Sequence, residues 1–390
     1  MAEAFKNLIN TDTVRHAADH LQRVCTAFDR ERFIQTASRN LDELEFKARA
    51  QRVADGLAEA LPAHFADAAD TLERALAPPL GFDDKGEPVG LGQRLSQEGL
   101  SGWVLWGAGE YVARQGMDDL PRALTCLHAL TQRFTAEFAI RPFIERHADV
   151  VMPVLRQWVD DPSAHVRRLV SEGSRPRLPW GLRLQSFVAD PTPTLPLLRS
   201  LQDDPSSYVR RSVANHLNDI AKDHPDVVAA WVRTHLPGAD PARSALLRHA
   251  SRSLIKQGHG PTLSAWGLGR TFAGSALLKL GAAQAAVGDG IDLHLQLHAK
   301  GSGPQELVVD YVVHHLRANG STARKVFKGW RRTLMPGEAI DLHKRHSLKE
   351  VTTRRLYPGH HLIELQINGQ VMAKAAFDLL PPQAPETAPP

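Results

Sequence analysis

The amino-acid sequence predicts a mainly α-helical protein, in which a helical-repeat solenoid is followed by a β-sandwich. Two near-copies of one segment, residues 158–168 and 201–211, lie in the middle of the chain, and a degraded third copy begins at Asp240. Their Asp-Pro steps start at residues 161, 204 and 240, so they are 43 and 36 residues apart. This period is typical of HEAT-type helical pairs. After Gly274 the pattern changes to alternating apolar and polar residues, which indicates strands.

Each copy of the repeat predicts the start of an amphipathic helix. Aspartate is a preferred helix cap, proline is tolerated at the first helical position, and apolar residues follow at helical spacing. The first two copies also carry a pair of arginines at the same place, Arg167 with Arg168 and Arg210 with Arg211. Because stacked repeats would align these pairs, we expect a basic concave surface that suits a polyanion.

The two patterns divide the chain into two domains. Helical periodicity from about residue 12 to residue 266 predicts a helical domain over residues 1–273. Alternating runs with Asn-Gly turns predict roughly seven strands of an immunoglobulin-like sandwich over residues 282–380, without the disulfide of antibody domains. We expect the boundary near residues 274–281. Residues 381–390 are rich in proline and predict a disordered tail.

Composition narrows the class of protein. A chain of 390 residues exceeds what one core usually holds, and its net charge of +4 and pI near 9.1 are modestly basic. Cys25 and Cys126 are the only cysteines, so neither a disulfide framework nor a cysteine zinc site is expected. The sequence shows no membrane-spanning stretch and no signal or transit peptide, which favours the reducing cytoplasm.

A loop in the first repeat offers candidate functional groups. Residues 171–181 place a carboxylate (Glu172), two guanidiniums (Arg175 and Arg177) and an indole (Trp180) between stiffening prolines. A purely structural repeat would continue there as apolar helix or end in a short turn, as the copy at Asn218 and Asp219 does. The structural alternative is a capped helix end whose tryptophan packs on the neighbouring repeat.

Two further carboxylates are candidates. Glu137 is expected on a helix among apolar neighbours, where a carboxylate needs a partner or a function. The structural alternative is an ion pair with Arg141, four residues further on. Asp219 lies at the end of the helix that carries the second arginine pair, and it is alternatively an ordinary loop residue.

These segments resemble the AlkC-type DNA alkylation-repair glycosylases, relatives of the AlkD type. The resemblance is carried by residues 102–106, 111–112, 137–143, 165–180 and 208–219, and it covers nearly the whole chain. It implies a monofunctional glycosylase that excises 3-methyladenine, 3-methylcytosine and 1-methyladenine from duplex DNA without flipping the base. It further implies base excision repair, which would take place at the nucleoid. The expected basic concave face implies that a monomer suffices, and no metal or cofactor is expected. The catalytic residues that it implies are Glu137, Glu172, Trp180 and Asp219.

The implied chemistry suits these residue types. A base alkylated at a ring nitrogen is already cationic, so it leaves without a general acid. The enzyme must then stabilise an oxocarbenium-like sugar and position a water molecule, and carboxylates can do both. An indole face attracts the developing cation and excludes bulk water.

The C-terminal domain contains a strongly basic stretch. Between residues 317 and 355 only Glu338, Asp341 and Glu350 oppose a series of cations, which are Arg317, Arg324, Lys325, Lys328, Arg331, Arg332, Lys344, Arg345, Lys349, Arg354 and Arg355. Such residues either protect edge strands from aggregation or bind DNA phosphates and grooves. We expect the second role. The expected DNA contacts of the whole chain are Arg141, Arg167, Arg168, Arg175, Arg177, Arg210, Arg211, Arg317, Arg331 and Arg332.

Two other functions fit the sequence. Most helical-repeat proteins bind other proteins, so a non-catalytic scaffold is one alternative. A protein that binds damaged DNA without cleaving any bond is the other.

Overall fold

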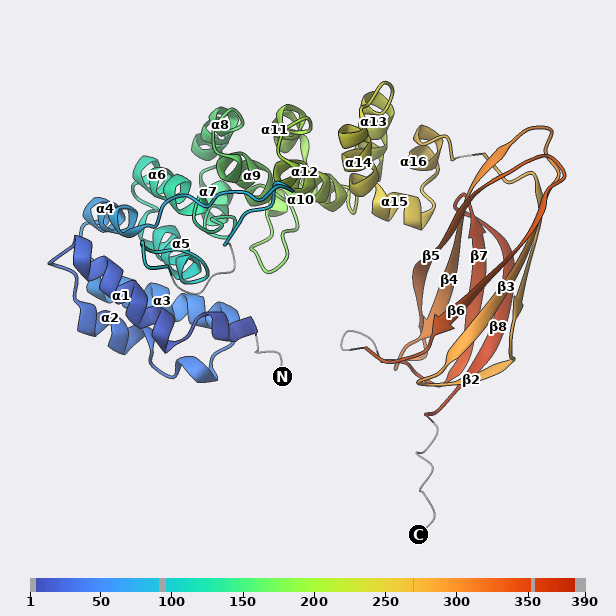
Figure 1. The fold of residues 1–390 in the computed structure, drawn as a ribbon, viewed down its shortest axis with the longest axis horizontal. Helices are drawn as coiled ribbons and strands as arrows, with labels where there is room; N and C mark the ends of the chain where they lie inside the picture. Colours follow the sequence, from blue (N-terminus) through green and yellow to red (C-terminus); the bar gives the residue numbers. More distant parts are fainter. Residues whose placement is uncertain (1–4, 91–95, 269, 352–354, 383–390) are drawn as a thin grey trace, which may run out of the picture. The chain divides into compact units, whose positions relative to one another are not determined.

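The computed structural model describes residues 5–90, 96–268, 270–351 and 355–382. Helices occupy the N-terminal part, coloured blue to yellow in Figure 1, and strands occupy the C-terminal part, coloured orange to red. The chain divides into two compact units. The first is Met1–Asp223 with Pro241–Ala250, and the second is His224–Asp240 with Ser251–Pro390.

The first unit is mainly helical, as the periodicity predicts, although the described residues 76–90 and 96–103 lie outside helices. Its α-helices are α1 (Thr11–Val24), α2 (Arg30–Ala37), α3 (Phe46–Ala60), α4 (Phe65–Ala75), α5 (Val104–Gln115), α6 (Leu120–Thr131), α7 (Arg141–Arg146), α8 (Ala148–Trp158), α9 (Ala164–Gly173), α10 (Gln185–Ala189), α11 (Leu195–Leu201), α12 (Ser207–Ile220) and α14 (Pro241–Ala250). Short 3-10 helices span Phe5–Leu8, Leu41–Glu43 and Thr192–Thr194. Helix α9 packs against α12, and α12 packs against α14, so consecutive copies of the repeat are neighbours (Figure 1).

The Asp-Pro steps start their helices differently from the sequence prediction. In the first two copies the proline precedes the helix, which begins after a serine N-cap, Ser163 or Ser206. The aspartate accepts a hydrogen bond from the backbone N–H of that serine, at 2.8 Å in both copies. Asp161 and Asp204 therefore shape the turn before the helix and do not cap it. Only in the third copy does the helix begin at the proline, Pro241.

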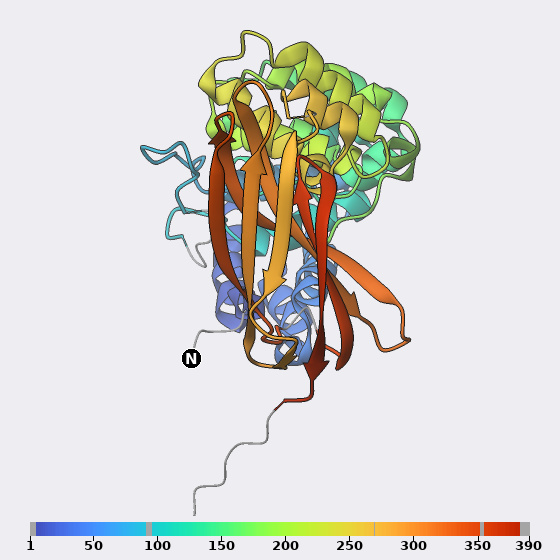
Figure 2. The same ribbon diagram turned by 90° about the vertical axis from the view of Figure 1, so that its right-hand side faces the viewer.

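The second unit combines three helices with the β domain. The helices are α13 (Pro225–His235), α15 (Arg252–Gln257) and α16 (Gly260–Ala265). The strands are β1 (Gly274–Leu280), β2 (Gln284–Ala286), β3 (Gly290–Ala299), β4 (Gln305–Leu316), β5 (Thr322–Leu334), β6 (Ala339–Ser347), β7 (Gly359–Ile367) and β8 (Gln370–Leu380). They form one sheet in the order β1-β3-β6 and another in the order β2-β8-β7-β4-β5 (Figure 2). Ile255, Leu263 and Leu268 pack with Val308, which joins α15 and α16 to the β domain.

The β domain begins earlier than residue 282. Residues 274–281, the expected boundary, contain β1, which pairs with β3 from Gly274 opposite Ala299 to Leu280 opposite Leu293. Leu277 and Leu278 are both apolar, so the sequence of β1 does not alternate cleanly between apolar and polar residues. The expected tail, residues 381–390, lies outside the described residues from residue 383 onward.

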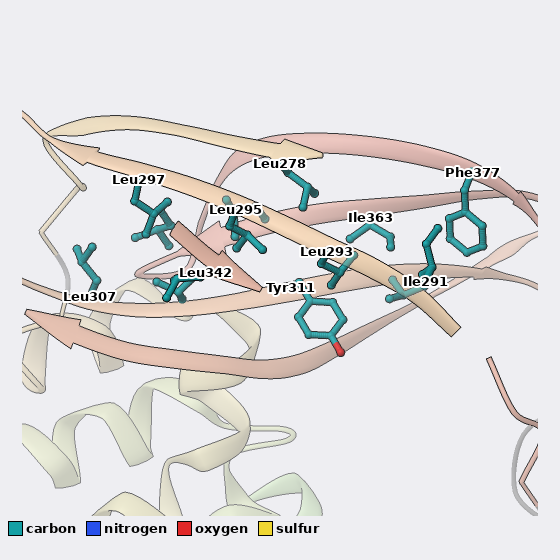
Figure 3. Close-up of a cluster of buried hydrophobic side chains, with 14 of the residues drawn as sticks. Leu278, Ile291, Leu293, Leu295, Leu297, Leu307, Tyr311, Leu342, Ile363 and Phe377 are labelled. Carbon is teal, nitrogen blue, oxygen red and sulfur yellow. The ribbon is translucent and has the colours of Figure 1, made fainter. Parts of the chain in front are cut away.

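The core of the β domain follows the alternation of the sequence. Along β3 the side chains of Ile291, Leu293, Leu295 and Leu297 are buried, while the residues between them are more exposed. They pack against residues of the other sheet such as Tyr311, Ile363 and Phe377 (Figure 3). Burial of one face of each sheet fixes the strand register, because a slip of one residue would expose the apolar face.

Two simpler expectations concern the cysteines and membranes. Both Cys25 and Cys126 are free thiols. Within the described residues, no helix combines the length and the apolar character needed to cross a bilayer.

Candidate functional site

A pocket of about 760 Å³ opens in the first unit between α9, α12 and the loop that follows α9. Three of the predicted catalytic residues, Glu137, Glu172 and Trp180, line it. The other lining residues are Leu8, Trp103, Phe134, Thr135, Phe138, Arg168, Arg175, Leu178, Pro179, Tyr208 and Arg211. The fold thus brings the two separate sequence motifs together at one cavity.

Glu137 is fixed by an arginine of the repeat. It lies in the turn segment between α6 and α7, not on a helix as predicted, and it is 8% exposed. Its Oε2 accepts hydrogen bonds from the Thr135 hydroxyl at 2.6 Å and from Arg168 Nη1. The alternative of an ion pair with Arg141 is wrong, because the carboxylate of Glu137 pairs with Arg168 of α9.

Glu172 lies on the last turn of α9 and is 5% exposed. Its Oε1 accepts from Arg175 Nη1 at 2.5 Å, and its Oε2 accepts from the Ser212 hydroxyl at 2.6 Å. Arg168 Nη2 lies 3.6 Å from the same Oε1, so Arg168 faces both glutamates. Burial opposes ionisation of Glu172, but the charges of Arg168 and Arg175 and the Ser212 hydroxyl hold its pKa below the usual range.

Asp219 supports the pocket from behind. This carboxylate is 2% exposed and does not line the cavity. Its Oδ2 accepts from Arg175 Nε at 2.7 Å, and its Oδ1 accepts from Lys222 Nζ at 2.8 Å. Arg175 is therefore held between Asp219 and Glu172, and Asp219 acts on Glu172 only through that guanidinium.

Arg141 organises the loop between α9 and α10. Its side chain is fully buried, with Nη1 donating to the Gly173 carbonyl at 2.8 Å and Nε donating to the Leu182 carbonyl at 2.5 Å. One guanidinium thereby joins the two ends of the loop. The predicted DNA contact of Arg141 is wrong for this reason, since no part of the side chain is available to a phosphate.

Trp180 is presented to solvent at the edge of the pocket. The side chain is 65% exposed, although tryptophan has a large apolar surface. Its φ of 64° lies in the left-handed region, which is unfavourable for a residue with a side chain. The alternative that this indole packs on a neighbouring repeat is wrong. An exposed tryptophan on a strained backbone indicates a functional contact.

The two arginines of each pair have different roles. The first arginine binds backbone carbonyls of its own turn: Arg167 Nη1 donates to the carbonyls of Asp161 and Pro162, and Arg210 Nη1 donates to those of Asp204 and Pro205. Arg167 also forms an ion pair with the Asp204 carboxylate at 2.6 Å. These first arginines are engaged in the repeat itself, which removes the reason to expect them on DNA.

The second arginine of each pair faces the pocket. The guanidinium carbons of Arg168 and Arg211 lie 5.3 Å and 5.8 Å from the ring centroid of Tyr208. Arg168 is occupied by the two glutamates, whereas the Arg211 side chain is 48% exposed and pairs with Glu87. Outside the pocket, Arg177 pairs with Asp223 at 2.6 Å.

Several residues of the site gave no signal in the sequence. Tyr208 and Ser212 stand in the second repeat like ordinary helix residues, yet they contact Arg168 and Glu172. His216 is fully buried below the site, and its Nδ1–H donates to the Ser171 carbonyl at 2.9 Å. Burial lowers the pKa of His216 to about 4, so the imidazole is neutral at neutral pH.

The predicted basic residues of the β domain that the structure describes are exposed, except for half-buried Lys344. Arg317 lies in the turn between β4 and β5, and Arg331 and Arg332 lie on β5, an edge strand of the five-stranded sheet. Arg354 is outside the described residues. Among the residues that the structure describes, no cluster of His, Cys, Asp and Glu side chains is placed to hold a metal ion.

Comparison with known proteins agrees with this architecture. Residues 275–381 match the family model of the uncharacterised protein YhaZ, C-terminal Ig-like domain. Over 380 residues the chain is 32% identical to the uncharacterized protein YhaZ of Bacillus subtilis (strain 168), covering 96% of this chain and 99% of that one. The Pseudomonas fluorescens alkylpurine DNA glycosylase AlkC, solved bound to DNA containing an abasic site analog, is 35% identical with a TM-score of 0.84. That alignment covers 97% of this chain and 100% of AlkC.

This similarity places the chain in a class of helical DNA glycosylases with an Ig-like C-terminal domain. The chain belongs to the AlkC family, which includes the YhaZ relative.

Proposed function

We propose that the protein is a monofunctional DNA glycosylase that hydrolyses the N-glycosidic bond of alkylated bases in duplex DNA, as part of base excision repair. The observation that carries this proposal is the pair of glutamates, Glu137 and Glu172, which share Arg168 at one pocket beside the exposed Trp180. The proposal is supported by the similarity to AlkC, an alkylpurine DNA glycosylase.

The proposed reaction begins with a base that carries a positive charge, such as 3-methyladenine, 3-methylcytosine or 1-methyladenine. The bond between C1′ of the deoxyribose and the base nitrogen breaks, and its electron pair neutralises the departing base. Glu137 and Glu172 stabilise the oxocarbenium-like sugar, and one of them positions the water whose oxygen forms the new bond to C1′. The water proton passes through that carboxylate to solvent.

Each supporting residue has a part in this scheme. Arg168 orients both glutamates, Arg168 and Arg175 favour the ionised form of Glu172, and Asp219 positions Arg175. The Trp180 indole would lie against the lesion-bearing sugar, where its face attracts the developing positive charge. Because the lesion supplies its own activation, the base need not enter a closed pocket, and we propose excision without base flipping.

We propose that fewer arginines contact DNA than the sequence suggested. We propose a HEAT-like solenoid in which Arg211 at the pocket and Arg177 outside it contact phosphates. In the β-sandwich, exposed Arg317, Arg331 and Arg332 would contact the phosphates or a groove. Such an enzyme would act as a monomer in the cytoplasm, on the DNA of the nucleoid.

The direct test is incubation of the full-length protein with duplex DNA methylated at defined bases. Released base is measured by chromatography, and abasic sites are measured by strand cleavage with heat and alkali. The expected result is release of the cationic bases and an intact strand before alkali treatment. DNA binding without base release would instead favour the damage-binding alternative, and no DNA binding would favour the scaffold.

A further inference from the structure

The connection between α4 and α5 contains a hairpin, residues 81–89, at the rim of the pocket. The backbone N–H of Asp83 donates to the Glu87 carbonyl, and that of Val89 donates to the Gly81 carbonyl, both at 2.9 Å. The Asp83 carboxylate accepts from the N–H groups of Lys85 and Glu87 at 2.9 Å and 2.8 Å. The hairpin is therefore held in shape by its own hydrogen bonds.

The hairpin docks on the two repeat helices that build the site. The Phe82 ring stacks on His165 of α9 with centroids 4.7 Å apart and an interplanar angle of 21°. The Ser207 hydroxyl of α12 donates to the Lys85 carbonyl at 3.2 Å. These contacts join positions far apart in the sequence, and they place the acidic residues of the hairpin beside the pocket.

Glu87 uses this placement to bind Arg211. Arg211 Nη1 and Nη2 donate to the two oxygens of the Glu87 carboxylate, the second at 2.6 Å. This fork is the geometry with which a guanidinium binds a phosphate as well as a carboxylate. The two side chains are 48% and 40% exposed, so the pair is open to solvent. Such exposed pairs are weak and readily exchanged.

We infer that Glu87 occupies the phosphate-binding face of Arg211 in the free protein, and that DNA must displace it. This inference rests on the proposed function, because it requires DNA at the pocket. After the exchange, Arg211 holds a phosphate and still lies beside Tyr208, while Glu87 is left facing a polyanion. The hairpin thus weakens binding to every duplex and acts as a competitor built into the chain.

The experiment measures binding of undamaged duplex DNA at several salt concentrations by the full-length protein and its Glu87→Gln variant. We expect the variant to bind about 2- to 5-fold more tightly at low salt, with the difference shrinking as salt screens the pair. The matched control is Asp84→Asn, which removes the same charge from the same hairpin. Among the described residues, Asp84 makes no ion pair with Arg211. Both variants gain some affinity because the DNA is repelled by one negative charge fewer. The additional gain in affinity of Glu87→Gln over Asp84→Asn measures the competition for Arg211.

A double-mutant cycle with Arg211→Ala completes the test. In the Arg211→Ala protein, Glu87→Gln should raise the DNA affinity no more than Asp84→Asn does, because the guanidinium for which Glu87 and the DNA phosphate compete is absent. If Glu87→Gln binds no more tightly than Asp84→Asn in the otherwise unchanged protein, the competition is absent. If it binds more weakly, Glu87 orients Arg211 for DNA instead. If either result is found while methylated bases are released normally, only this inference is overturned. If the wild-type protein does not bind DNA, both this inference and the proposed function are overturned.

Discussion

The two well-preserved copies of the repeat begin alike and end differently. In both, an aspartate shapes the turn, and the first arginine of the pair donates to two carbonyls of that turn. Equivalent positions are 43 residues apart, so Glu172 of the first copy corresponds to Asn215 of the second. Helix α9 then ends at Gly173 and the chain enters the loop that carries Trp180, whereas α12 continues to Ile220.

This difference shows how a structural repeat becomes a site. The first copy supplies Glu172 from the last turn of its helix, and Arg175 and Trp180 from the loop that follows. The second copy keeps its helix, and Ser212 and Asp219 along it bind the groups that the first copy supplies. The second, regular copy thus supports the first, irregular copy. Substitutions in the irregular copy should mainly affect catalysis, and those in the regular copy should mainly affect stability or DNA binding.

The largest effect is expected from the irregular copy, at Glu172. Glu172→Gln should lower single-turnover base release by about two to three powers of ten, because it removes charge stabilisation that acts only in the transition state. The variant should still fold and bind DNA, since the amide can accept from Ser212, but its free energy of unfolding should fall because Arg168 and Arg175 lose a buried counter-charge. Glu137→Gln should have a comparable effect, and exposed Glu145→Gln is the control. Nearly normal release by both Gln variants at the pocket would contradict their catalytic role.

The sequence predicted this site because its rare residues are close together in the chain. Glu172, Arg175 and Trp180 lie within nine positions, and helical periodicity placed their loop at the end of a helix. Glu137 was identified as a buried carboxylate, but its partner Arg168 is 31 residues away, and only the packing of α9 determines the pair. For the same reason the buried position of Arg141 and the backbone contacts of Arg167 and Arg210 were missed, since an arginine in a sequence does not show which carbonyls surround it.

For the fold, too, the sequence predicted the types of element but not the contacts between distant segments. Periodicity separated the helical part from the strands, because the two patterns have different spacings. The hairpin of residues 81–89 was not predicted, because its contacts are with helices about 80 to 120 residues further along the chain. Long-range contacts of this kind leave no local pattern.

Trp180 should show the next largest effect. Trp180→Ala should slow base release by up to about thirtyfold, because an indole face contributes up to about 2 kcal/mol to a nearby cation. The melting temperature should hardly fall, since the side chain is already 65% exposed. Trp180→Gly should be at least as stable as Trp180→Ala, because glycine adopts the left-handed backbone without strain. A large stability loss with unchanged activity per folded molecule would mean that Trp180 is a core residue.

The arginine pairs test the comparison between repeat and site most directly. Arg211→Ala should reduce the slope of log binding constant against log salt by about 0.9, the contribution of one phosphate contact. Arg210→Ala should leave that slope unchanged and should instead lower the free energy of unfolding by about 1–3 kcal/mol, since it leaves turn carbonyls without a donor. Salt titrations and chemical denaturation of both variants provide the measurement. Equal salt slopes for the two variants would contradict the assignment of a structural role to the first arginine and a phosphate contact to the second.

The smallest effect is a pH dependence that originates below the pocket, at His216. Burial lowers its pKa from the ordinary value of 6.5 to about 4 in the folded protein, so the unfolded chain binds more protons between these values. The free energy of unfolding should therefore fall as pH decreases from about 6.5 to about 4. His216→Asn keeps a donor for the Ser171 carbonyl but cannot titrate, so its stability should decline less steeply over this range.

Buried His20 and His165, whose pKa values are also lowered by burial, should leave a residual slope. Exposed His64→Asn is the matched control and should retain the wild-type slope. Denaturation curves at closely spaced pH values decide the matter, and a His216→Asn profile parallel to that of the wild type would show that this imidazole is not responsible.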